Sequence, residues 1–124
     1  MRAVWTRATL AGVLVASMAA CSARHEDRTV VYTVSGGDTA GTVAIQYANP
    51  DGLMSTDSIS GTVSWTKELT LGEHAPTAHV DAHTLAPGLD TKLSLRCTIT
   101  VDGKELARQG GSQACDATVE LDDL

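Results

Sequence analysis

The positions of the three cysteines say most about the chemistry of this chain. Cys21 closes an uncharged stretch, residues 8–20, which follows a short segment that contains Arg2 and Arg7 and no acidic residue. A basic segment followed by a short apolar stretch is the pattern of a secretory signal, because a spanning helix needs roughly 20 apolar residues. The stretch therefore predicts a cleavable signal peptide over residues 1–20 and not a permanent transmembrane helix.

The residues before Cys21 predict that this cysteine is lipidated. Met18-Ala19-Ala20-Cys21 looks like a lipobox, the site at which bacterial lipoproteins are diacylated on the cysteine thiol and cut just before it. Two acyl chains, at about 0.8 kcal/mol for each buried methylene, hold a protein stably on a membrane. We expect residues 21–28 to form the lipidated cysteine and a flexible tether, with the protein on the extracytoplasmic face of the cell membrane. The alternative is a secreted protein with a free thiol at Cys21.

Cys97 and Cys115 are predicted to form a disulfide, since an exported chain meets an oxidising environment. Closing a loop of about 18 residues contributes on the order of 3 kcal/mol in the chain-entropy model. The alternative is a Cys/Cys/His metal site, but no C-x-x-C pair is present and no histidine is near either cysteine in sequence.

A run of histidine and aspartate provides the second set of chemically versatile residues. His79, Asp81 and His83 alternate with small apolar residues, so in a strand they share one face about 6 to 7 Å apart. Such a face could bind a metal such as zinc or copper, or a small ligand, and an envelope lipoprotein with this binding function is the alternative that we keep open. The simpler interpretation is a solvated strand face rich in histidine, and we expect no metal or other cofactor. Without a G-x-S-x-G or H-E-x-x-H motif, the sequence also predicts that the protein is not an enzyme.

Composition limits the fold and the partners. Residues 21–124 are the length of one domain, and they carry seven basic against fifteen acidic side chains. An acidic domain repels nucleic acid, so nucleic-acid binding is not expected. The chain has no phenylalanine, and the domain's aromatic residues are Tyr32, Tyr47 and Trp65. Trp65 is therefore expected to anchor a small aliphatic core.

Residues 29–124 show the two-residue periodicity of strands, interrupted by Gly, Pro, Asn and Asp. Predicted strands are 29–34, 42–48, a segment around 63–71, 78–82, 93–101, 104–108 and 115–121, with a weaker stretch at 53–60 and a loop at 109–112. Asp51, Asp57 and Asp90 are expected on turns. The pattern favours an all-β fold, a small antiparallel immunoglobulin-like β-sandwich of about seven strands with one disulfide whose cysteines face inward.

Several of these segments resemble one family, the MmpS-type transport accessory proteins of mycobacteria and related actinobacteria. The matching segments, in order, are residues 31–36, 44–47 with 49–52, 64–67, and 97–104 followed by Cys115. The resemblance implies a non-catalytic extracytoplasmic β-sandwich that assists MmpL transporters, of the resistance-nodulation-division class, in exporting lipids or siderophores. Members of the family keep an N-terminal transmembrane helix, whereas this chain has a predicted signal peptide and lipobox. We expect an envelope lipoprotein with a membrane anchor, whose partner is either an MmpL-type transporter or another component of the cell envelope.

Overall fold

The computed structural model describes residues 26–124. Strands account for most of this part of the chain, and a short 3-10 helix η3 (Leu121–Asp123) follows the last strand. The strands are β1 (Arg28–Ala48), β2 (Met54–Leu71), β3 (Thr77–Thr84), β4 (Ser94–Val101), β5 (Lys104–Ser112) and β6 (Ala114–Glu120). Every pairing between them is antiparallel.

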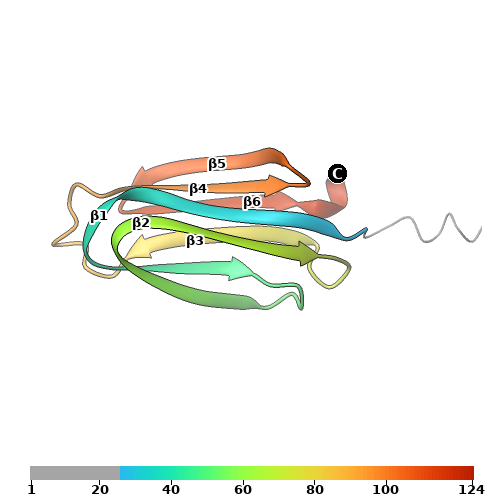
Figure 1. The fold of residues 1–124 in the computed structure, drawn as a ribbon, viewed down its shortest axis with the longest axis horizontal. Coiled ribbons are helices and arrows are strands. Elements are labelled where there is room, and N and C mark those ends of the chain that lie inside the picture. The colour runs from blue at the N-terminus through green and yellow to red at the C-terminus, as the bar shows by residue number, and fades with distance from the viewer. Residues whose placement is uncertain (1–25) are drawn as a thin grey trace, which may run out of the picture.

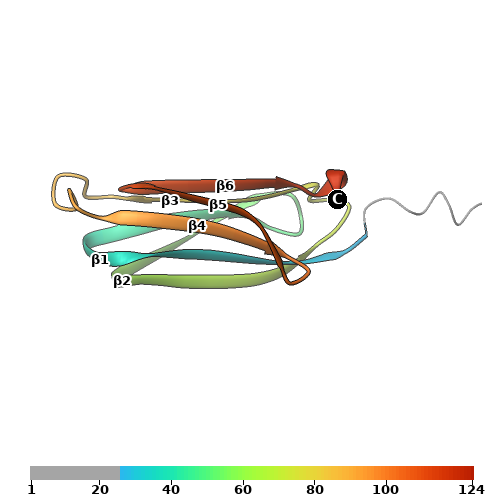
Figure 2. The same cartoon turned by 90° about the horizontal axis from the view of Figure 1, so that it is seen from above.

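A long β1–β2 hairpin contributes strands to both layers of the molecule (Figure 1). The first half of β1 pairs with β4, which pairs in turn with β5. The second half of β1 pairs with β3, which pairs with β6. Because β2 follows β1 along both halves, it forms an outer strand of each layer. Figure 2 shows the layer that contains β3 and β6 lying against the layer that contains β4 and the first half of β1.

The hairpin turns from one layer into the other through two irregularities in its register. The β1–β2 pairing shifts between Ser35 and Asp38 and again between Thr39 and Thr42. Opposite this bend, Gly61 has a φ of +81°, a conformation that costs glycine little. The expected stop after residue 34 is therefore wrong: Ser35–Asp38 is a bend within one continuous strand.

Two further predictions from the sequence also need correction, because strand pairing extends through polar segments. Of the weaker stretch at 53–60, residues 54–60 belong to β2, where they pair with residues 42–48 in the second half of β1. The expected loop at 109–112 is part of β5, paired with residues 94–97 of β4. Six long strands thus replace about seven short ones, and the all-β antiparallel sandwich is confirmed.

The core fills the space between the layers with aliphatic side chains and two tyrosines. Along β4, Leu95, Cys97, Ile99 and Val101 are buried while the residues between them are more exposed, as their alternation predicts. On one side of the sandwich β5 and β6 approach each other, and the Asp116 amide donates to Gln109 Oε1 at 2.9 Å. The fold is therefore closed nearly like a barrel on that side, while the β2 side stays open.

Within residues 26–124 no helix is long and apolar enough to cross a membrane. The predicted signal peptide and Cys21 lie outside the described residues.

Candidate functional site

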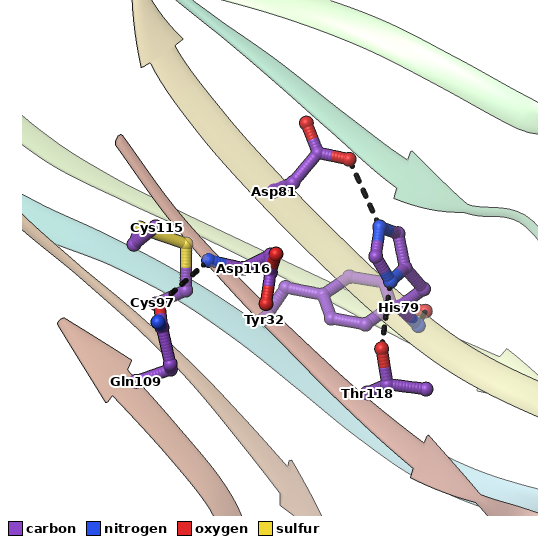
Figure 3. Close-up of polar contacts among 8 residues, drawn as sticks. All are labelled: Tyr32, His79, Asp81, Cys97, Gln109, Cys115, Asp116 and Thr118. Carbon is purple, nitrogen blue, oxygen red and sulfur yellow. Dashed lines mark hydrogen bonds and ion pairs between the residues drawn. A yellow bond between two sulfur atoms is a disulfide. The ribbon is translucent and has the colours of Figure 1, made fainter. Parts of the chain in front are cut away.

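The disulfide links the two layers. Cys97 on β4 and Cys115 on β6 are bonded, with their Cα atoms 5.6 Å apart, and both side chains are buried (Figure 3). The predicted pairing and the inward direction of both cysteines are thus confirmed. The bridge holds together strands from different layers, next to the side closed by β5 and β6.

The histidine run lies on the outer face of β3, as its alternation predicts, beside β6. His79 Nε2 lies 2.9 Å from Asp81 Oδ2, and His79 Nδ1 lies 2.9 Å from the Thr118 hydroxyl on β6 (Figure 3). Both ring nitrogens of His79 therefore have partners in the protein. His83 is exposed further along the strand.

An open depression of about 520 Å³ covers this part of the β3 and β6 surface. His79, Asp81, His83, Gln109 and Asp116 are among its lining residues. Asp116 pairs directly with Asp81 across the strands, a partner that the sequence analysis did not find because it depends on which strand neighbours β3. Like charges opposite each other are unfavourable, and Asp81 is also in contact with the His79 ring.

A metal centre finds little support on this surface. Among residues 26–124 no group of three or more histidine, cysteine, aspartate or glutamate side chains is placed to hold a metal ion. His79 is already held by Thr118 and Asp81, so coordination through its ring would require breaking one of these contacts. The arrangement fits the solvated strand face that the sequence favours.

The aromatic residues of the domain form a single stack at the open side of the sandwich. The rings of Tyr32 and Tyr47 are 6.0 Å apart, and those of Tyr47 and Trp65 are 5.4 Å apart. Trp65 is partly buried, and its Nε1 donates to Asp57 at 3.0 Å. Trp65 therefore packs against the edge of the core. Val34 on β1 pairs with Trp65 on β2 and with Cys97 on β4, so β1 lies between the tryptophan and the disulfide.

Asp57 lies within β2, so its expected place on a turn is wrong.

Tyr32 joins this stack to the β3 strand. Its buried hydroxyl donates to the Ala48 carbonyl at 2.9 Å and accepts from the His79 amide at 3.4 Å. The backbone pairing of β1 with β3 ends at Tyr47 and Val80, so the hydroxyl bridges the two strands just beyond their paired residues. Burial raises the pKa of Tyr32 to about 12, although the bond from the His79 amide opposes the shift. The phenol is therefore neutral near pH 7.

Asp90 is a buried carboxylate that ties the β3–β4 loop to the bend in β1. It accepts hydrogen bonds from the Thr39 hydroxyl at 2.7 Å, from the Ala40 amide at 2.6 Å and from the Thr84 hydroxyl. These bonds hold the pKa of Asp90 below its usual range, and the bond from Thr84 contributes most to the shift. The sequence predicts a turn at Asp90 but carries no signal for its burial, because Thr39 and Ala40 are distant from it in sequence.

Comparison with known proteins adds no family assignment to this geometry. No protein-family model matches the chain, and no curated protein sequence matches it.

Proposed function

We propose that this protein is an extracytoplasmic lipoprotein, anchored to the cell membrane through Cys21, that acts as a non-catalytic accessory or interaction protein. Its suggested role is to support export of lipids or siderophores by a transporter of the MmpL type. The proposal combines the N-terminal signal pattern with the resemblance of the β-domain to MmpS-type proteins.

The pairing of Cys97 with Cys115 is the observation that carries the proposal. A structural disulfide is typical of exported proteins, because thiols are kept reduced in the cytosol. With two of the three cysteines paired, Cys21 is the remaining thiol, and it stands where the apolar stretch ends. This division of roles favours lipidation of Cys21.

The lipid anchor is tested by the intact mass of the protein extracted from native membranes, with and without reduction. We expect a diacyl mass increment that a Cys21→Ala variant lacks, and a gain of about two mass units on reduction from the Cys97–Cys115 bond. An unacylated chain released into the medium would contradict the anchor.

The transporter partnership is tested separately, by purifying the lipidated protein from native membranes after chemical crosslinking. We expect a resistance-nodulation-division transporter to be enriched with the wild-type protein and reduced with Cys21→Ala. Loss of the protein should also lower export of the transporter's lipid or siderophore cargo. Unchanged export together with an absence of transporter enrichment would contradict this part of the proposal while leaving the anchor intact.

A further inference from the structure

Exposed apolar side chains lie at both ends of the sandwich. At one end are Leu53, 66% exposed, and Met54, 48% exposed; at the other are Leu85 at 59% and Leu89 at 72%. Adjacent, large and unpartnered apolar side chains at one tip are a feature of surfaces that contact proteins or membranes.

The turn that carries Leu53 is rigid. The Asn49 amide donates to the Leu53 carbonyl and the Gly52 amide to the Asn49 carbonyl, both at 2.9 Å. Asp51 accepts from the Leu53 amide at 2.9 Å, and Gly52, with a φ of +85°, lies so close to the His74 carbonyl that a side chain there would clash. Leu53 is therefore held in solvent by a fixed backbone, and binding through it would order little additional chain.

This turn lies at the end of the molecule where the described chain begins. Arg28 pairs with Leu71 and Ala48 pairs with Met54, while the bend of β1 lies at the opposite end (Figure 1). Six residues, 22–27, lie between Cys21 and the start of β1 at Arg28, and a peptide linker of that length reaches on the order of 15 Å. A lipid on Cys21 would therefore keep the Leu53 end, and not the Leu89 end, near the bilayer.

We propose that Leu53 and Met54 form a bilayer-contact surface that inserts among lipid headgroups and holds the sandwich upright on the membrane. The proposal rests on the lipid anchor proposed above. Asp51 and Glu73 are exposed beside the turn, so the surface fits a zwitterionic bilayer better than an anionic one.

The test uses the full lipidated protein, whose mass first verifies the acyl chains, in phosphatidylcholine nanodiscs that contain a nitroxide-labelled lipid. Methyl resonances are compared for Leu53 and Met54 against Leu89 and against Leu71, which is buried at the tethered end. We expect strong relaxation at Leu53 and Met54, little at Leu89, and weaker relaxation at the tethered end when anionic phosphatidylglycerol is added. In a Leu53→Ser/Met54→Ser variant the relaxation of Leu71 should fall, whereas the matched Leu89→Ser variant should leave it unchanged.

Each other outcome overturns the proposal in a distinct way. Relaxation of Leu71 that is unchanged in the double variant would show that the tether alone sets the distance. Equal relaxation at Leu53 and Leu89 would show a domain without a preferred end, and Leu53 buried in a dimer would assign the surface to a second copy. A protein that carries no acyl chain would refute the anchor itself, and with it this inference, before the nanodisc comparison.

Discussion

The buried hydroxyl of Tyr32 connects β1 to β3 at the point where their backbone pairing ends. Its oxygen contacts the Ala48 carbonyl and the His79 amide, two backbone groups that would otherwise lack this partner. Replacing a buried hydrogen-bonding group while leaving its partners unsatisfied is costly.

We expect Tyr32→Phe to lower the free energy of unfolding by about 1–3 kcal/mol, measured by chemical denaturation. Tyr47→Phe is the matched control, because the Tyr47 ring is buried in the same stack and no hydrogen bond of its hydroxyl is found within the described residues. Equal effects of the two substitutions would contradict the bridging role of the Tyr32 hydroxyl.

Asp90 makes the free energy of unfolding depend on pH in the acid range. Because its pKa is lower in the folded protein than in the unfolded chain, its contribution is present above the ordinary carboxyl pKa of about 4 and is lost as the pH falls through the lower folded value. We expect Asp90→Asn to lower the melting temperature at pH 7 and to flatten the decline in stability below about pH 4. Asp51→Asn, at an exposed turn, is the control, and an unchanged acid profile in Asp90→Asn would argue against this role.

At the scale of the element, β2 is the strand with the most exposed edge. It is 18 residues long and, among residues 26–124, pairs with β1 alone, and a long open edge favours pairing with another chain. Asp57 and Lys67 lie on its inward-facing side, Asp57 bonded to Trp65 and the Lys67 amine 5.7 Å from the centre of the Tyr47 ring. Inward-pointing charges on edge strands oppose strand addition, because an added strand would separate them from water.

We expect Lys67→Val to promote self-association, since it removes an inward charge and extends the apolar side of β2. Sedimentation velocity measured over a range of concentrations should show a dimer or larger species for this variant. Glu68→Val, which changes the neighbouring outward side chain, should associate less. If the Lys67→Val variant stays monomeric at the highest concentration, the bend and twist of β2 protect its edge without the lysine.

At the scale of the whole molecule, the Cys97–Cys115 disulfide joins layers that otherwise share the β1–β2 hairpin and the packed core. The small aliphatic core offers few large side chains, so a cross-link adds a substantial fraction of the stability. We expect a Cys97→Ala/Cys115→Ala variant to lose about 3 kcal/mol of unfolding free energy, measured by denaturation in guanidinium chloride. Adding reductant should destabilise the wild-type protein and leave the variant unchanged; an equal response of both would point to an effect other than the bridge.

Much of the fold could be predicted from local sequence patterns. The alternation along residues 93–101 determines which side chains face inward, and this periodicity also places Cys97 and Cys115 on the buried side. Asp102 and Gly103, which lie between the predicted strands 93–101 and 104–108, form the turn that connects β4 and β5, and both have a positive φ. Turn residues and period-two alternation act over a few positions, so they can be recognised without knowing the partners of a strand.

The tertiary structure decided which distant segments of the chain lie next to each other. Sequence patterns place His79, Asp81 and His83 on one face, but the arrival of β6 beside β3 supplies Thr118 and Asp116. The burial of Asp90 and the bond of Trp65 to Asp57 likewise depend on the bend that carries β1 and β2 from one layer to the other. The sequence by itself determined the all-β class and the inward direction of the two bonded cysteines, while lipidation of Cys21 stays a prediction. Contacts between distant segments could not be read from it, because they arise when the layers pack and the register of pairing is selected over the whole chain.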